Sequence, residues 1–446
     1  YMEQTKENKM GTMPVNRLLV TMSLPMVISM LVQALYNVVD SIFVAKINEN
    51  ALTAVSLAFP IQSLMIAAAA GTCVGINAVL SRSLGEKDFE KVNKCACNGI
   101  ILMAASFLLF VAVGIFGVAP FYRSQTDDAE ILRFGTDYLT IVCCCSFGIF
   151  MQFTFERLLQ ATGKTFYTML TQGAGAIINI ILDPILIFGC NLGIAGAALA
   201  TMISQYISFV LLLIMIRRGG NMQIRFCNFK PSLYFYKEMI RGGTPSLCRQ
   251  GLASLAAIFL NRTAGLYGDA AIAGMSIVSR ISMFANSALI GFGQGFQPVC
   301  GFNYGAGKNE RVLEAFWFCV KYAFVFLLIV GTAGFVFAPE LVTLFRKDDL
   351  EVIAVGTAAL RFQVIAFPLN AWIVMCNMML QSVGKGLKAS IVASARQGLC
   401  FIPLIFILPH FLGLFGVEIC QAISDVLTLV ISVPIGMSVV KEMKQN

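Results

Sequence analysis

Two aspartates lie inside long apolar stretches of the chain, where a charge is unfavourable. Asp40 and Asp183 each fall a few residues before the predicted outer end of an apolar segment. A charged group at membrane depth costs roughly 2.5 kcal/mol or more and tends to mark an ion or substrate pathway. Asn179 stands one helical turn before Asp183, and Thr201 lies several residues into the following segment. We expect these four side chains to converge.

Two carboxylates confined in a dry site repel each other, so one keeps a proton unless a cation neutralises the pair. Pro184 follows Asp183 directly, removes a backbone donor and disturbs the carbonyl of Ile180, which would add another oxygen ligand. Such oxygen-only chemistry suits a proton or a sodium ion. The sequence predicts a coupling-cation site at Asp40, Asn179, Asp183 and Thr201, with Na⁺ as one candidate ion. The alternative is that these residues sit near the outer lipid headgroups.

The segments that position these residues are predicted to be transmembrane helices. Hydrophobic residues make up 58% of the 446 positions and charged residues 13%, against about 25% charged residues in a soluble domain. About 20 apolar residues cross a bilayer as a helix, and lipid requires the backbone to satisfy its own hydrogen bonds. The chain is therefore predicted to be an all-α membrane protein. Twelve spans are expected, at 18–44, 52–80, 95–119, 134–158, 164–188, 193–216, 238–265, 273–299, 314–338, 354–381, 386–408 and 413–437.

The basic residues gather in the loops of one predicted side. The net charge is +8, and most of the 32 lysines and arginines fall in loops that share the side of both termini. This bias places both termini in the cytoplasm and makes a nucleic-acid partner unnecessary. Nearly all of the 14 cysteines lie within apolar segments, where they act as small hydrophobic residues. The sequence shows no metal cluster, activated nucleophile or phosphate loop, so neither an enzyme nor a cofactor is predicted.

The chain is an internal duplication. An offset of 220 residues aligns Pro25 with Pro245, and the spacing Gly71-x-x-x-Gly75 with Gly291-x-x-x-Gly295. Six spans in each half make the repeat parallel, with its pseudo-twofold axis along the membrane normal. We expect an N-lobe at 1–218, a cytoplasmic linker at 219–236 and a C-lobe at 237–446. The GxxxG spacings would let helices approach closely.

The predicted cation site exists in only one of the two lobes. The repeat positions of Asp40, Asn179 and Asp183 carry no acid in the second half. The corresponding residues are Leu260 or Asn261 and, at the offset of 225 that aligns Pro184 with Pro409, Leu404 and Leu408. An asymmetric antiporter would keep acids in one lobe, whereas a purely structural duplication has little reason to do so.

Three further acids allow more than one interpretation. Glu156 stands beside Arg157 near a predicted cytoplasmic end, where an interfacial salt bridge and a substrate contact are equally reasonable. Glu418 and Asp425, in the last span, could line the second lobe or form hydrogen bonds between helices.

These features resemble the multidrug and toxic compound extrusion (MATE) family. The likeness rests on Pro25, Gln33, Tyr36 and Asp40 in the first span, on Asn179, Asp183-Pro184 and Thr201, and on the segments 155–163 and 423–427. It covers nearly the whole chain and is nearest to the bacterial DinF-like and MepA-like branch.

The resemblance implies a V-shaped pair of six-helix lobes in the bacterial inner membrane, working as a monomer. It implies export of small amphipathic or cationic drugs and dyes in exchange for H⁺ or Na⁺. Gln33 and Tyr36 would then border the cation site, Glu156 would belong to the substrate cavity, and Pro25 and Pro184 would act as hinges.

Two other functions compete with the exporter. A lipid-linked precursor flippase of the same superfamily would hold pyrophosphate with basic residues, and Arg249, Arg262 and Arg280 keep that alternative open. A channel or receptor is disfavoured, because it would not explain a duplicated chain with acids in one half.

Overall fold

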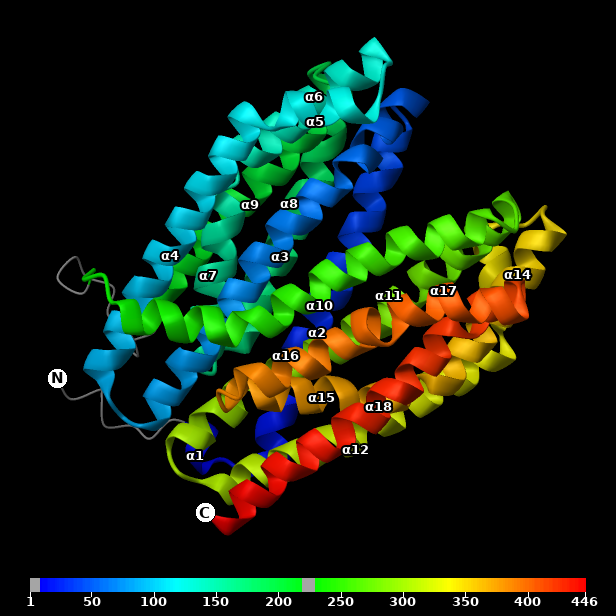
Figure 1. The fold of residues 1–446 in the computed structure, drawn as a ribbon. Coiled ribbons are helices and arrows are strands. Elements are labelled where there is room, and N and C mark those ends of the chain that lie inside the picture. The colour runs from blue at the N-terminus through cyan, green and yellow to red at the C-terminus, as the bar shows by residue number, and fades with distance from the viewer. Residues whose placement is uncertain (1–8, 219–228) are drawn as a thin grey trace.

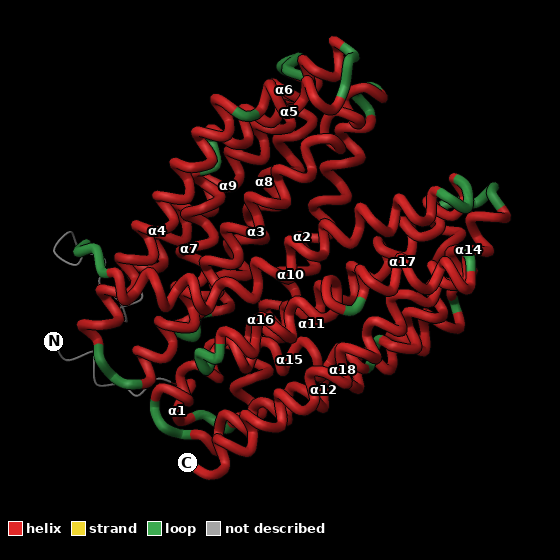
Figure 2. The backbone as a smooth tube through the Cα atoms, viewed as in Figure 1, coloured by secondary structure: helices red, strands yellow, loops and turns green. Residues whose placement is uncertain are grey.

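The protein is a bundle of helices. The computed structural model describes residues 9–218 and 229–446, and within these ranges every regular element is a helix. Figure 2 shows the helices joined by short loops. The prediction of an all-α membrane protein is confirmed, as expected for a chain that must satisfy its backbone hydrogen bonds in lipid.

The first half of the chain forms one lobe (Figure 1). Its helices are α1 Lys9–Thr12, α2 Val15–Ala45, α3 Glu49–Gly85, α4 Phe89–Phe116, α5 Val118–Gln125, α6 Ala129–Cys144, α7 Phe147–Ala161, α8 Thr165–Pro184, the π-helix η2 Ile185–Gly189, and α9 Ile194–Arg218.

The second half repeats this arrangement as the C-lobe. Its helices are α10 Leu233–Gly265, α11 Asp269–Gly305, α12 Asn309–Val336, α13 Ala338–Phe345, α14 Leu350–Ala366, α15 Leu369–Ser382, α16 Gly386–Ser394, the π-helix η4 Ala395–Leu399, α17 Phe401–Leu412, and α18 Leu414–Gln445.

The helices agree with twelve membrane spans. In the described part of the chain, nine helices are long and apolar enough to cross a membrane, and two bent pairs raise this number to eleven. The remaining span is α10, which is long enough but carries Lys237, Glu238, Arg241, Arg249 and Arg262. Most helices run a few residues beyond the predicted bounds, because their polar ends continue past the hydrocarbon core.

The fourth and tenth spans are bent, although the sequence predicted each as one helix. α6 and α7 meet at 43°, and α14 and α15 meet at 56°. Pro368 begins the α15 helix, where its ring cannot continue the hydrogen-bond ladder of α14. The two bends fall at corresponding places in the halves, so the duplication preserves them.

The duplication is also visible in the backbone angles of matched glycines. Gly163 and Gly384, which match at an offset of 221 residues, have φ values of 91° and 85°, and Gly193 and Gly413, which match at 220, have 60° and 64°. Glycine adopts this left-handed region without steric cost. These matched turns give each half the same entry into its fifth and sixth spans.

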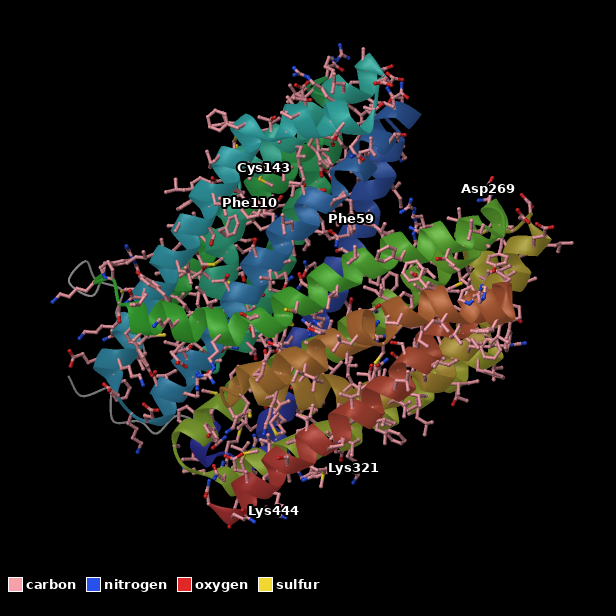
Figure 3. All side chains as sticks on the ribbon, in the orientation of Figure 1. Phe59, Phe110, Cys143, Asp269, Lys321 and Lys444 are labelled. Carbon is pink, nitrogen blue, oxygen red and sulfur yellow. The ribbon has the colours of Figure 1, made fainter. Side chains whose placement is uncertain are left out.

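The two lobes converge at the end of the molecule that holds α1 and the end of α18, and they diverge at the opposite end (Figure 1). Figure 3 labels Lys444 at the converging end and Asp269 at the far tip of the C-lobe. At the converging end, a Cβ built on Gly71 of α3 would lie 3.2 Å from the carbonyl oxygen of Gly243 in α10. A Cβ on Gly291 of α11 would lie 2.7 Å from the carbonyl oxygen of Met26 in α2. The GxxxG glycines therefore bring helices of different lobes together.

The expected linker at 219–236 falls partly outside the described residues, which resume at residue 229. α10 begins at Leu233, so the first helix of the C-lobe starts within the segment predicted as linker.

Candidate functional site

Asn179 joins three helices of the N-lobe. Its Nδ2 donates to the Tyr36 hydroxyl at 3.1 Å and to the Thr201 hydroxyl at 3.3 Å. The Tyr36 and Thr201 hydroxyl oxygens are 3.5 Å apart. The Thr201 hydroxyl donates its own proton to the Ala197 carbonyl, which leaves its oxygen free to accept. Asn179 is only 1% exposed, so this junction between α2, α8 and α9 is enclosed.

Asp183 and Asp40 place two bare carboxyl groups beside this junction. Asp183 is fully buried, and neither of its carboxylate oxygens has a hydrogen-bond partner. Oδ1 of Asp40 is also enclosed without a partner. The two carboxyl groups lie close enough to share a hydrogen bond when one of them is protonated. The structure thus brings the four predicted residues together.

The arrangement is rich in oxygen and poor in positive charge. None of the ion pairs among the described residues includes Asp40 or Asp183. Oδ1 of Asn179 is likewise buried without a partner. Burying an unpaired carboxylate is strongly unfavourable, so a shared proton or a small hard cation would stabilise the pair. These oxygen atoms match a cation that prefers oxygen ligands. The site has only two acids, and no group of three or more His, Cys, Asp or Glu residues that could hold a metal ion occurs in the described ranges.

Two residues of this region were missed by the sequence analysis. Tyr138 of α6 is 6% exposed and interacts electrostatically with both Asp40 and Asp183. Gln62 of α3 donates from Nε2 to the Tyr138 hydroxyl at 3.0 Å. The sequence does show Gln62 and Tyr138 as polar side chains within apolar segments. Their spacing, however, does not link them to Asp40 or Asp183.

Gln33 lies one layer nearer the converging end of the lobes than Tyr36. Its Oε1 accepts a hydrogen bond from Nε2 of Gln172 at 3.0 Å. Since Gln172 is seven residues before Asn179 on α8, the Gln33–Gln172 pair is about two turns away from the Asn179 junction. Gln33 therefore lies along α8 from the Asn179 junction and is not next to the two carboxylates.

Comparison with known families identifies this architecture. The MatE family model matches residues 25–185 and, a second time, residues 245–407. The two matches cover most of the chain and reproduce the internal repeat. The chain belongs to the multidrug and toxic compound extrusion (MATE) family.

Individual MATE proteins resemble the chain over nearly its full length. The Multidrug export protein MepA of Staphylococcus haemolyticus is 28% identical over 397 residues, which is 89% of this chain and 87% of that protein. A MATE crystal structure in complex with MaL6 has a TM-score of 0.94 at 28% identity and covers 99% of this chain and 100% of its own. The outward-facing conformation of a multidrug resistance MATE family transporter of the MOP superfamily has a TM-score of 0.92, again at 28% identity and with 99% of each chain covered.

The two prolines predicted as hinges differ in their surroundings. Pro25 lies within α2, which continues unbroken from Val15 to Ala45 in this MATE structure. Pro184 ends α8, and the π-helix η2 follows directly. π-helical turns often occur at functional sites, and this one lies next to Asp183.

Glu156 does not form the salt bridge with Arg157 that one interpretation expected. No ion pair within 4.0 Å joins them among the described residues. Arg157, which is 5% exposed, instead donates from Nη1 to Oε1 of Gln160 at 3.1 Å. Adjacent residues on a helix point in different directions, so the two charged groups stay beyond ion-pair distance, although their charges still interact.

The C-lobe has no counterpart of the paired aspartates but contains its own polar cluster. Oδ1 of Asp425 on α18 accepts from Nε of Arg396 at 2.8 Å and from Nε2 of Gln421 at 3.0 Å. Of the two interpretations of Asp425, a hydrogen bond between helices is the one observed.

Proposed function

We propose that this MATE protein is a secondary active antiporter that exports amphipathic and cationic small molecules in exchange for protons or sodium ions. The observation that carries the proposal is the enclosed pair Asp40 and Asp183, whose carboxylate oxygens lack a counter-charge. A pair that needs a proton or cation binds and releases one as its exposure changes.

The geometry suggests how ion binding would act on the lobes. Asp40 lies in the part of α2 that points away from the termini, while Ser23 and Met26, at the other end of α2, pack against Gly295 and Gly291 of α11. One helix thus connects the carboxylates with the contact between the lobes. A small rearrangement of α2 on ion binding would favour one opening over the other, which is the requirement of alternating access.

The orientation follows from the basic residues. Lys308 donates to the Gly11 carbonyl at 2.9 Å, and Lys385 pairs with Glu442 at 3.2 Å. These contacts gather basic loops and both terminal segments at one end. The positive-inside rule assigns that end to the cytoplasm, so the lobes diverge toward the outside of a bacterial cytoplasmic membrane. A monomer suffices for this function, because one chain supplies both lobes.

The family and the residue types support this substrate class. A relative is described as a multidrug export protein, and the 36 phenylalanines and 21 methionines of the chain supply soft apolar surfaces. Such surfaces repack around different amphipathic molecules.

The function can be tested in proteoliposomes with a fluorescent cationic dye. A pH gradient and a sodium gradient are imposed separately, and dye movement is followed with the other gradient held at zero. We expect uphill dye transport with one of the two ions and none without a gradient. Dye movement that is indifferent to both gradients would refute the antiporter.

The flippase alternative makes a different prediction in the same vesicles. It requires translocation of a pyrophosphate-linked lipid and no ion-driven movement of the dye. Of the three arginines that favoured it, Arg262 and Arg280 are exposed, and only Arg249 is partly enclosed.

A further inference from the structure

Three arginines gather where the lobes meet, at the depth of the membrane. Arg249 of α10 interacts electrostatically with Arg157 of the N-lobe helix α7 and with Arg396 of the C-lobe. Guanidinium groups repel one another and require anions nearby. Among the ion pairs of the described residues, Asp425 is the one acid within 4.0 Å of any of these three arginines, and it contacts Arg396.

Packing between α10 and its neighbours directs Arg249 toward Arg396. A Cβ on Gly386 would lie 2.8 Å from Cγ of Arg241, and a Cβ on Gly398 would lie 2.6 Å from Cδ1 of Leu252. Arg241 and Leu252 therefore mark the stripe of α10 that faces α16 and η4. Arg249 stands eight residues after Arg241 and three before Leu252, so it lies on that same stripe.

Arg396 is held in a position from which it can bind a further group. It belongs to the π-helix η4, and its carbonyl accepts a hydrogen bond from the Ser424 hydroxyl. Its contact with Asp425 uses Nε. The guanidinium of arginine carries five donors in a planar fork, so the two terminal nitrogens stay available. The Arg396 side chain is 22% exposed, whereas that of Asp425 is 2% exposed.

A buried amide beside Asp425 completes the cluster. Asn370 of α15 is 1% exposed and interacts with the Asp425 carboxyl group. Neither its Nδ2 nor its Oδ1 makes a hydrogen bond of normal geometry. A buried amide that lacks well-formed hydrogen bonds is unfavourable, and a ligand oxygen would give its Nδ2 a better acceptor.

We propose that Arg249, Arg396 and Asn370 form a site for an anionic group, such as a carboxylate, sulfonate or phosphate, on an amphipathic molecule. The inference rests on the proposed export function and narrows its substrate class. The guanidinium groups of this cluster would hold the anionic group of a molecule whose positive charge the export function already accepts. Molecules that carry both charges are then preferred over purely cationic ones. Arginine suits this role because its fork matches the geometry of carboxylate and phosphate oxygens.

The test compares tetramethylrhodamine, which carries a carboxylate, with its methyl ester, which is otherwise identical and purely cationic. Binding to the purified protein in phosphatidylcholine nanodiscs is followed by dye anisotropy. Quenching of tryptophan fluorescence locates the dye, because both tryptophans of the chain, Trp317 and Trp372, are C-lobe residues with ring centroids 5.8 Å apart. No ion gradient is present, so this assay measures binding alone. Its result is therefore independent of whether ion-coupled transport is observed in the proteoliposomes.

We expect the wild-type protein to bind the carboxylate form about tenfold more tightly than the ester, as one charge-assisted contact provides. Arg249→Gln should bring this ratio close to one, and Arg249→Lys should restore part of it. Arg262→Gln removes an exposed arginine of the same helix and should keep the wild-type ratio. Melting curves check that each variant is folded.

Two outcomes would overturn the site. One is equal binding of acid and ester by the wild-type protein, and the other is an unchanged ratio in folded Arg249→Gln. A further arm adds phosphatidylglycerol to the nanodiscs. If the preference for the carboxylate form is lost in these nanodiscs but present in phosphatidylcholine alone, the lipid headgroup competes for the site. That result would support the anion site and show that it also accepts a lipid headgroup.

Discussion

Gly75 of α3 and Met239 of α10 make one of the tightest contacts between the two lobes. A Cβ on Gly75 would overlap the carbonyl oxygen of Met239 and would lie 3.0 Å from the backbone nitrogen of Gly243. The absence of a side chain at residue 75 therefore permits the backbones of the two lobes to touch. A side chain there must push the lobes apart at the end that holds the termini.

Gly75→Val should open this contact. Overpacking of this kind costs about 1–3 kcal/mol, so we expect a lower Tm. Hydrogen–deuterium exchange should increase in residues 71–85 and 233–247. Gly251→Ala, on α10 where an added Cβ meets nothing within 4 Å, is the matched control. Wild-type exchange in Gly75→Val would mean that this contact does not hold the lobes together.

Asp40→Asn and Asp183→Asn should each abolish gradient-driven efflux while the protein stays folded. Each change removes one of two mutually repelling buried carboxylates, so Tm should be equal to or above the wild-type value. Efflux in proteoliposomes and melting curves measure the two effects. Asp137→Asn, an exposed acid on α6, should behave as wild type. Unchanged efflux in both site variants would remove the coupling assignment.

Asn179→Leu should lower both stability and efflux. It removes the donor to the hydroxyls of Tyr36 and Thr201 in an enclosed place, and a lost buried partner costs about 1–3 kcal/mol. Tyr36→Phe removes the hydroxyl that accepts one of these two hydrogen bonds from Asn179. The Tm losses of the two variants should be less than additive in the double variant, because the residues share an interaction. Strict additivity would show that the hydrogen bond contributes little.

Arg311→Ala should release the N-terminal segment from the C-lobe. Nη2 of Arg311 donates to the carbonyls of Met10 and Met13 at 3.1 and 2.6 Å. Nε donates to Oδ1 of Asn303 at 3.1 Å, and Asn303 itself donates to the Met10 carbonyl at 3.0 Å. Hydrogen bonds to charged groups contribute about 1.5–3 kcal/mol.

The measurement for Arg311→Ala is hydrogen–deuterium exchange in residues 9–14, which should increase. Lys441→Ala removes an exposed basic side chain near the same end and serves as the control. If residues 9–14 exchange as slowly as in the wild type, the remaining contacts, from Lys308 to Gly11 and from Asn303 to Met10, are sufficient by themselves.

Several features could be predicted from the chain alone because each depends on a local or repeating pattern. The length and apolarity of the segments required helices, since lipid offers no partner for the backbone. The alignment of Pro25 with Pro245 revealed the duplication, which the double family match confirmed. The depth of Asp40, Asn179 and Asp183 follows from their distance to a helix end. Depth alone was enough to predict that they could meet.

Other features depend on how each helix is rotated and which helix it packs against, and no single segment encodes this. Tyr138 and Gln62 join the aspartate region only because α3 packs against both α2 and α6. Arg249 is partly enclosed while Arg262 on the same helix is exposed, for the same reason.

The sequence therefore determined which residues lie in the membrane and at what depth, because the bilayer imposes those limits on each helix separately. The tertiary structure decided which of them face one another and which remain without a partner. These contacts result from long-range packing. An example is the contact of Gly75 with Met239, where the backbones of the two lobes meet because residue 75 has no side chain.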